Sequence, residues 1–198
     1  MRALAESGGV AARFEEARSL AILEAPIESS GRLYFAPPDW LARHVESPGE
    51  SRVVVRDDSV SFRDETGVQR LELASSDVAR AMVGNVMLLM RGDLESLEKR
   101  YHIDFQATGE GWTLELEPRD KLLRGIIERL RVEGRANRLV RMETRETSGD
   151  VTATRFSDVR LGVDFTREER ERIFSVDAVS VEEGSAAAQE TAGREAAR

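Results

Sequence analysis

Much of the chain alternates apolar and charged residues with the two-residue period of a half-exposed β-strand. In one such stretch Leu130 and Val132 alternate with Arg129, Arg131 and Glu133. Because successive side chains of a strand point to opposite faces, segments of this kind form antiparallel sheets with one dry and one solvated face. We expect about ten or eleven strands, at residues 11–23, 28–35, 40–44, 52–56, 59–63, 68–73, 102–107, 112–117, 128–133, 138–147 and 150–159.

One stretch interrupts this alternation. Residues 79–90 are mostly apolar and hold three of the chain's five methionines. Ser76 is a suitable N-cap for a helix, Asp77 complements the positive end of the helix dipole, and Gly92 is a suitable terminator. The pattern therefore predicts a helix that ends at about Arg91. Two shorter helices are expected at residues 93–101 and 120–127.

The methionine-rich helix has two interpretations. It is either ordinary core or the cover of a binding cavity, a role that suits unbranched, polarizable Met side chains. Many strands supply apolar residues to the dry face, whereas only about three short helices are available to cover it. A large sheet so sparsely covered is typical of a partly open barrel with a hollow. The residues predicted to line the cavity are Phe14, Leu33, Phe35, Trp40, Phe62, Met82, Val83, Val86, Met87, Met90, Trp112, Leu114, Leu116, Leu130 and Val132.

Length and charge narrow the classes of protein. A chain of 198 residues suits one domain, which we expect to span residues 1–176, and the low-complexity residues 177–198 are expected to be a disordered tail. The net charge of −8 argues against a nucleic-acid partner. No apolar run is long enough to span a bilayer, so an integral membrane protein is not expected. Residues 1–10 show no signal-peptide pattern, which leaves a cytoplasmic protein or a mature exported one.

The chain offers little catalytic chemistry. It has no cysteine, and its two histidines, His44 and His102, cannot form an ordinary zinc site unless carboxylates join them. No nucleophile elbow, P-loop or dinucleotide-binding glycine pattern is present. We therefore expect no enzyme, no metal site and no cofactor. Four arginines on the late strands pair with neighbouring glutamates or, as a minority alternative, form an anion-binding face: Arg129, Arg131, Arg141 and Arg145.

Several segments resemble the LolA family of periplasmic lipoprotein carriers. They are the strand that carries Phe14, the Gly-x-Leu-x-Phe-x-x-Pro segment at residues 31–38, the aliphatic strand 53–58, and the closing segment 155–161 that leads to Phe165. The resemblance implies a mainly β (α+β) fold, in which an incomplete antiparallel barrel is closed by a helical lid over a hydrophobic cavity for acyl chains. It also implies a periplasmic location, with the signal peptide absent from this chain.

The resemblance has one departure. The lipoprotein carriers have an arginine just before the proline of the Gly-x-Leu segment, and that arginine holds the lid by hydrogen bonds. Here the position is Pro37, which has no such donor. A different contact must therefore hold the lid closed in this protein.

These observations favour a non-enzymatic periplasmic carrier that takes a lipid or lipoprotein toward the outer membrane, with an inner-membrane donor and an outer-membrane acceptor as partners. A lipid-sensing regulatory protein of the envelope, with the same fold and a protein partner, is the alternative. A hydrolase or isomerase would require His44, His102 or a carboxylate pair to face the hollow. The cargo lipid and the oligomeric state do not follow from the sequence.

Overall fold

The computed structural model describes residues 8–177, so all of the predicted tail except its first residue lies outside the described part of the chain. Eleven strands form one antiparallel sheet in the order β6-β5-β4-β3-β2-β1-β11-β10-β9-β8-β7. The strands are β1 Gly9–Ser19, β2 Ile27–Ala36, β3 Trp40–Ser47, β4 Ser51–Arg56, β5 Ser59–Asp64, β6 Gly67–Glu72, β7 Tyr101–Thr108, β8 Gly111–Pro118, β9 Ile127–Arg135, β10 Arg138–Glu146 and β11 Val151–Val163.

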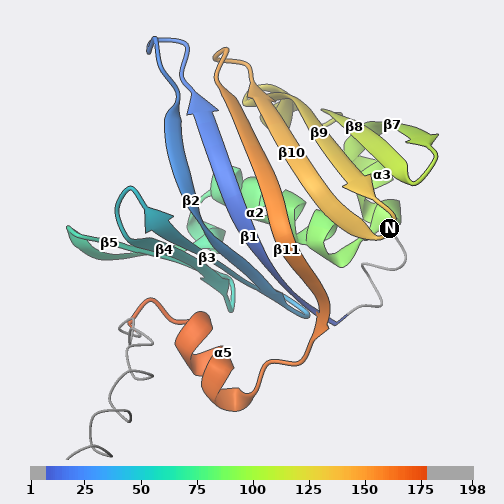
Figure 1. Ribbon diagram of the computed structural model, residues 1–198. Coiled ribbons are helices and arrows are strands. Elements are labelled where there is room, and N and C mark those ends of the chain that lie inside the picture. Colours follow the sequence, from blue (N-terminus) through green and yellow to red (C-terminus); the bar gives the residue numbers. More distant parts are fainter. Residues whose placement is uncertain (1–7, 178–198) are drawn as a thin grey trace, which may run out of the picture.

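The sheet is strongly curved and is not closed into a barrel (Figure 1). Its edges are β6 and β7, which do not pair with each other. The prediction of an incomplete barrel with ten or eleven strands is therefore confirmed. The strand bounds also agree closely, except that β1 ends at Ser19 and β11 continues to Val163.

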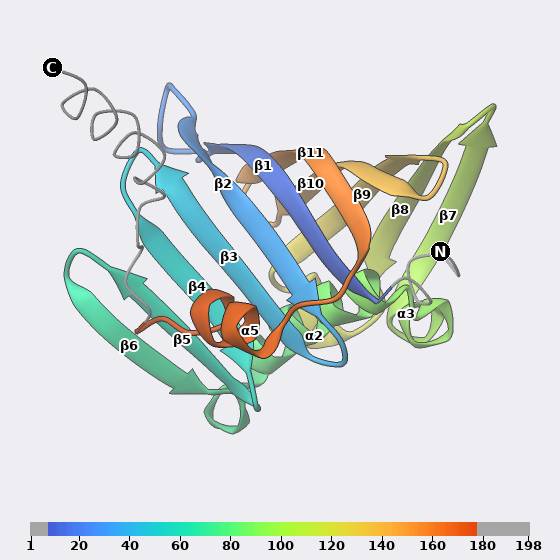
Figure 2. The ribbon, with the colours of Figure 1, turned by 60° about the horizontal axis from the view of Figure 1, so that its bottom comes forward.

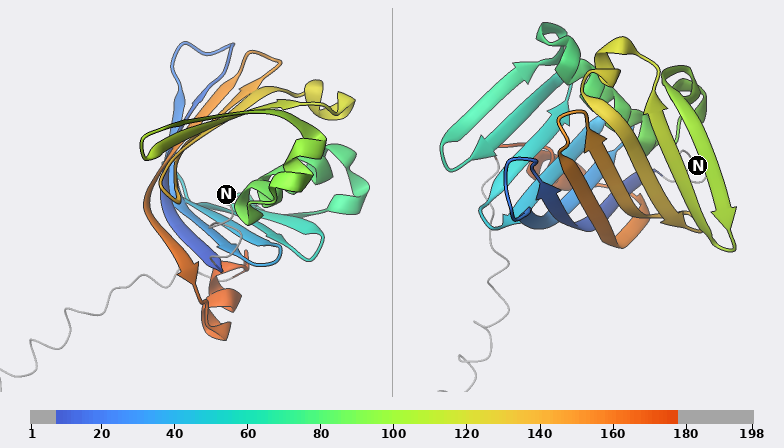
Figure 3. Two further views of the ribbon diagram at one scale, coloured as in Figure 1. Left: turned by 90° about the vertical axis from the view of Figure 1, so that its right-hand side faces the viewer. Right: turned by 90° about the horizontal axis from the view of Figure 1, so that it is seen from above.

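Helices α2 Asp77–Arg91 and α3 Leu94–Arg100 lie on the concave side of the sheet (Figures 2 and 3). The one-turn helix α4 Lys121–Arg124 contacts α2 from the connection between β8 and β9, and α5 Arg167–Ile173 lies on the other side of the sheet. A short 3-10 turn, η1 Leu73–Ser75, precedes α2.

The ends of α2 are those that the sequence predicts. The Ser76 side chain accepts a hydrogen bond from the Ala79 N–H, and Asp77 lies in the first turn. Gly92 ends the helix in the left-handed region, at φ 64°. Because a residue without Cβ adopts that conformation at no steric cost, glycine is the natural terminator.

Adjacent residues of the same strands pack on opposite sides of the sheet. On β2, Phe35 packs against α2, whereas Ala36 packs against the chain segment around α5. On β4, Val55 likewise packs against α2, whereas Val54 packs against the segment around α5. We call the side that α2 covers the inner face and the side that α5 covers the outer face.

Helix α5 was not predicted from the sequence. Its start is a capping box, in which Thr166 and Glu169 satisfy each other's backbone N–H groups. Phe165, Ile173 and Phe174 then pack on the outer face of the sheet; the strand residues beneath them are Ala36, Ala42 and Val54, with Tyr34 and Trp40 at the margin. The S/T-x-x-E pattern was thus the available signal for this helix.

His44 joins α5 to the sheet. Its Nε2 lies 2.9 Å from the Ile173 carbonyl oxygen, to which the neutral ring donates as the Nε2–H tautomer. Burial lowers the pKa of His44, and the hydrogen bond to Ile173 opposes that shift without cancelling it. The folded protein therefore holds this imidazole neutral at pH values where the unfolded chain protonates it.

We predict that His44 makes the folded protein less stable in mild acid. Its pKa is lower in the folded state, so the unfolded state binds more protons as the pH falls below about 6.5. Thermal unfolding at pH 7.5 and 5.5 measures the loss. His44→Gln should show a smaller loss than the wild type, while His102→Gln, a substitution at an exposed histidine, should behave as the wild type. An equal loss in all three proteins would contradict the prediction.

Candidate functional site

Helix α2 has two apolar faces that contact two different parts of the sheet. On one face, Met87 and Met90 pack against Val10, Phe35 and Val55 of strands β1, β2 and β4. On the opposite face, Leu88 packs in a cluster built from α3, α4 and strands β7, β8 and β9; its other members are Leu97, Tyr101, Leu114, Leu116, Leu123, Leu130 and Val132. One helix thus covers the apolar inner surface of both arms of the open sheet.

Most of the residues predicted to line a cavity meet at this helix. Leu33, Val83 and Val86 pack at the margin of the β1–β2–β4 cluster, which contains Phe35, Met87 and Met90. Leu114, Leu116, Leu130 and Val132 belong to the other cluster, with Trp112 at its margin. The methionine-rich helix and the predicted wall residues are therefore in direct contact in this conformation.

Four predicted residues lie at the periphery or outside this arrangement, and one of them, a tryptophan, lies on the outer face of the sheet. Met82 is exposed on α2. Phe62 points to the inner face, since it pairs with Val53 in the β4–β5 register, and it is half-buried. Phe14 is also on the inner face and is only 2% exposed, yet it belongs to neither cluster; the guanidinium group of Arg43 stacks on its ring.

The assignment of Trp40 to the inner face is corrected by the structure. Trp40 lies on the outer face, where its ring centroid is 5.7 Å from that of Phe174 and the Arg56 guanidinium stacks 4.2 Å from it. The residue that continues the inner face on β3 is Leu41, which pairs with Phe35. The sequence does not reveal which residues of β3 point inward, because the turn at Pro37-Pro38 breaks the strand and the alternation of β2 cannot be counted across it.

Trp112 is held on the inner face by a glycine and a carbonyl group. Its indole lies over Gly134, where a Cβ atom would fall 2.0 Å from the ring, and its Nε1–H donates to the Ala136 carbonyl at 2.8 Å. The two tryptophans of the chain therefore lie on opposite faces of the sheet, so the fluorescence of each one is sensitive to a different face.

The C-terminal end of α2 is fixed by an arginine of the helix itself. Arg91 Nε donates to the Pro38 carbonyl oxygen at 2.9 Å, and its guanidinium forms an ion pair with Asp39. Pro38 and Asp39 are in the turn between β2 and β3 that also contains Pro37. This contact joins residues 53 positions apart, so no local pattern could have predicted it.

Two polar groups are buried beside α2 without a hydrogen-bond partner among the described residues. They are the Asn85 side-chain amide, with the residue 4% exposed, and the Tyr101 hydroxyl, with the residue fully buried. Burial raises the pKa of Tyr101 to about 12, so its hydroxyl is neutral at physiological pH. An unpaired buried amide costs about 1–3 kcal/mol, which weakens the packing of α2 in this position.

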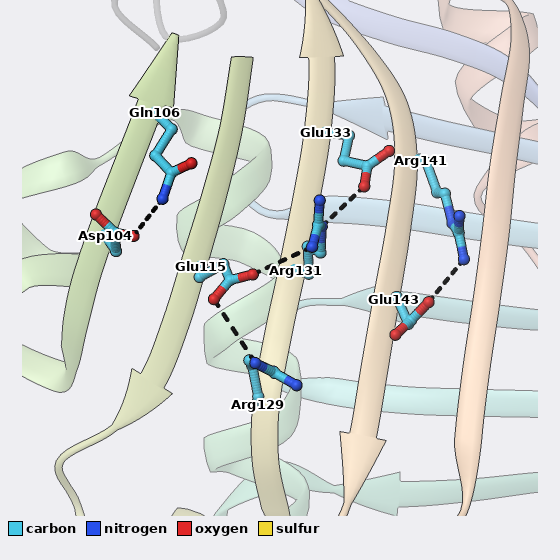
Figure 4. A network of polar contacts seen from close by, with 8 residues as sticks. All are labelled: Asp104, Gln106, Glu115, Arg129, Arg131, Glu133, Arg141 and Glu143. Atoms are coloured by element: carbon cyan, nitrogen blue, oxygen red, sulfur yellow. Dashed lines mark hydrogen bonds and ion pairs between the residues drawn. The ribbon is translucent and has the colours of Figure 1, made fainter.

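The late-strand arginines pair with glutamates across the outer face (Figure 4). Arg131 contacts Glu115 at 3.3 Å and Glu133 at 2.8 Å, Arg129 also reaches Glu115, at 3.7 Å, and Arg141 contacts Glu143 at 2.6 Å. The contacts of Arg129 and Arg131 with Glu115 are the cross-strand pairing that the sequence favoured over an anion-binding face, whereas Arg131–Glu133 and Arg141–Glu143 join residues of the same strand. Arg145 differs, because its Nε is buried without a hydrogen-bond partner in the described part of the chain.

Neither histidine faces α2. His44 is on the outer face against Ile173, and His102 is exposed on β7, next to the inward-packing Ile103. Over residues 8–177 no group of three His, Asp or Glu side chains is arranged to hold a metal ion. Within the same residues no helix has the length and apolar character needed to cross a membrane.

Comparison with solved structures finds similar chains at low sequence identity. A chain of the Pseudomonas aeruginosa MucA/MucB complex has a TM-score of 0.50 and 10% identity, with 84% of this chain and 56% of that chain covered. A LolA superfamily protein from Nitrosomonas europaea has a TM-score of 0.44 and 12% identity, with 88% and 93% covered. A DUF1329 family protein from Desulfovibrio piger has a TM-score of 0.45 and 15% identity, with 88% and 92% covered.

No curated protein matches the sequence. The family model described as outer membrane lipoprotein carrier protein LolA-like matches residues 1–161, which include all eleven strands except the end of β11, and α2, α3 and α4. Helix α5 lies beyond the matched segment. The chain therefore belongs to the LolA-like family of outer membrane lipoprotein carrier proteins.

Proposed function

We propose that the protein is a non-enzymatic carrier that binds the acyl chains of a lipid or lipoprotein between α2 and the inner face of the sheet. One observation carries the proposal: a single helix covers the apolar inner surface of both arms of an open sheet. An acyl chain can replace the contacts of this helix with either arm without breaking a strand pair. Membership of the LolA-like family supports this function and a location in the periplasm, on the way to the outer membrane.

The burial of an acyl chain supplies enough free energy to replace the contacts of α2 with the sheet. Burying acyl chains contributes about 0.8 kcal/mol per methylene group, so a chain of about 14 carbons is worth roughly 10 kcal/mol before other costs. The side chains of α2 that meet the β1–β2–β4 part of the sheet include Met87 and Met90, which adapt to ligands of varied shape at little cost.

A carrier must also release its cargo, and α2 is held weakly enough for that. The Arg91–Asp39 ion pair is about half exposed at both side chains, and exposed pairs contribute about 0–1 kcal/mol. The unpaired amide of Asn85 further destabilises the closed position. We propose that α2 moves to admit cargo from an inner-membrane donor and to deliver it to an outer-membrane acceptor.

A lipid-sensing envelope regulator is the second candidate. The fold is shared with a chain of the MucA/MucB complex, which was solved as an assembly of two proteins. This candidate also uses the inner face but requires a protein partner. Pull-down from solubilised envelope membranes that recovers one stoichiometric membrane partner, whose binding changes with bound lipid, would favour it over a carrier.

We predict that acyl chains bind next to Trp112 and away from Trp40. A brominated fatty acid quenches tryptophan only at short range. Trp40→Phe, which retains Trp112 on the inner face, should be strongly quenched, while Trp112→Phe, which retains Trp40 under α5, should be quenched little. Circular dichroism confirms that both variants fold. Equal quenching of the two proteins, or none in either, would contradict the proposed binding face.

We predict that Arg91→Ala loosens α2. Loss of the contacts with Pro38 and Asp39 should speed amide hydrogen exchange in the last two turns of α2 and raise the dissociation rate of a bound fatty acid, while the free energy of unfolding falls by less than about 1 kcal/mol. Arg80→Ala is the control, since the Arg80 guanidinium pairs with Asp77 within the same helix. Unchanged exchange in the Arg91 variant would show that this contact does not hold the helix.

We predict the opposite effect for Asn85→Leu. Leucine has a similar branched shape and no polar atoms to leave unpaired, so the free energy of unfolding should rise by about 1–3 kcal/mol. Chemical denaturation measures the change, and stopped-flow release of a fluorescent fatty acid should become slower. Asn137→Leu, at an exposed turn position, should leave both quantities nearly unchanged. A loss of stability in the Asn85 variant would mean that the amide is satisfied in solution.

A further inference from the structure

The inner face is not apolar along its whole length. On β1 the inward positions run from Val10, which packs against α2, through Phe14 to Glu16. Val10 and Glu16 are six residues apart, about 20 Å along a strand, which is roughly the length of a fatty acyl chain. Helix α2 crosses the sheet away from the β1–β2 hairpin (Figures 1 and 3). One end of the inner face is therefore covered by methionines and the other end carries charge.

The charge at this end comes from a compact polar cluster. Arg43 of β3 reaches across β2, where its Nη2 donates to Glu16 at 2.8 Å and to the Ser29 hydroxyl at 3.3 Å. The Thr154 hydroxyl of β11 donates to the other oxygen of Glu16 at 2.9 Å. Four neighbouring strands thus contribute to a single polar site on the inner face.

The guanidinium group is held in a fixed place. Its carbon lies 4.3 Å above the centre of the Phe14 ring, a distance typical of a cation–π contact. Gly31 pairs with Phe14 on the intervening strand β2, so no side chain stands between Arg43 and the ring. The Arg43 and Glu16 side chains remain 29% and 21% exposed, so a ligand on the inner face can reach them.

The local charge favours an anion. Arg18, the next inward position of β1 after Glu16, is exposed and pairs with Thr152 of β11 and Ile27 of β2. Arg18 and Arg43 lie on either side of Glu16. These three side chains together carry a charge of +1, whereas the net charge of the chain is −8. The planar guanidinium fork binds phosphate and carboxylate oxygens more specifically than any other side chain does.

We propose that Arg43 is the recognition site for the oxyanion headgroup of the cargo, with the acyl chain running from there along the inner face into the space between α2 and the sheet. The ligand class is an anionic amphiphile, with a phosphate or a carboxylate as its headgroup. In the free protein the Arg43 guanidinium group pairs with the Glu16 carboxylate, and the headgroup of the cargo replaces that carboxylate on binding. This inference rests on the proposed acyl-chain binding and adds a direction and a charge preference to it.

The test compares ligands with the same oleoyl chain and different headgroups. The probes are monooleoylglycerol, which is neutral, oleate, and oleoyl-lysophosphatidylglycerol, each titrated into the full chain by calorimetry below its critical micelle concentration. Wild-type protein should bind at least one anionic probe about tenfold more tightly than the neutral one, a difference of about 1.4 kcal/mol, since only a charged headgroup can replace Glu16 on the guanidinium group. Which anionic probe shows the preference distinguishes a carboxylate from a phosphate cargo.

Two substitutions should act in opposite directions. Arg43→Gln should abolish the anionic preference and leave the affinity for monooleoylglycerol unchanged. Glu16→Gln removes the competing carboxylate and should raise the affinity for the anionic probe several-fold. A merely structural ion pair would not produce opposite signs, because either substitution would then weaken all ligands alike. Arg13→Gln is the matched control: it removes one positive charge from the outward face of the same strand, where Arg13 pairs with Asp158.

The possible failures are distinguishable. If monooleoylglycerol binds but the anionic probes bind no better, the headgroup site is refuted and the acyl-chain site remains. If the preference survives in Arg43→Gln, the site lies elsewhere. If no probe binds, both the proposed function and this inference fail. Should Arg43→Gln not fold, Arg43→Lys, which keeps the charge and loses the planar fork, should reduce the preference without abolishing it, and an unreduced preference overturns the proposal.

Discussion

The structure depends on the packing of one helix between the two arms of a sheet that cannot close. Edge strands β6 and β7 do not pair, so strand pairing alone leaves the apolar inner face uncovered. Helix α2 solves this by carrying apolar side chains on two opposite sides, with Met87 and Met90 toward one arm and Leu88 toward the other. A helix used in this way has little polar surface of its own, which explains why its sequence looks so unlike that of the strands around it.

The two arms of the sheet cover their outer faces by different means. On β8, β9 and β10 the outward residues are charged, and they form a ladder of ion pairs around Glu115, Arg131 and Glu133. On β2, β3 and β4 the outward residues include Ala36, Ala42 and Val54, which are apolar and need a cover, and α5 supplies it. Small residues at these positions let Phe174 and Ile173 approach the sheet closely. The outer face of one arm thus interacts with water and that of the other with the C-terminal segment.

The sequence predicted the strands well because a two-residue period is strictly local and the turns are marked by glycine, proline and aspartate. It assigned Trp40 to the wrong face of the sheet. Pro37-Pro38 interrupts the alternation of inward and outward residues, and a shift of one residue moves every later side chain of the strand to the opposite face. It missed α5, where only the pair Thr166 and Glu169 marked a helix of seven residues. Contacts such as Arg91–Pro38 and Arg43–Glu16 join residues from different elements, so they depend on curvature and register that no local pattern contains.

In the proposed carrier α2 is the lid, and the contact that holds it has the roles of the two partners reversed relative to the family pattern. Where the carriers have an arginine in the segment before the proline, this chain has Pro37, and the arginine is instead Arg91 on the helix, with backbone and carboxylate oxygens of Pro38 and Asp39 as acceptors. An arginine on the helix moves away with it when α2 opens as we propose, which leaves the Asp39 carboxylate and the Pro38 carbonyl oxygen in the turn between β2 and β3. In the proposed binding mode an anionic headgroup is repelled there and attracted to Arg43, toward the other end of the inner face. The proposed opening of α2 and the proposed headgroup site therefore agree. The acyl chain points to the end of the inner face that α2 uncovers, and the charged headgroup points to the other end.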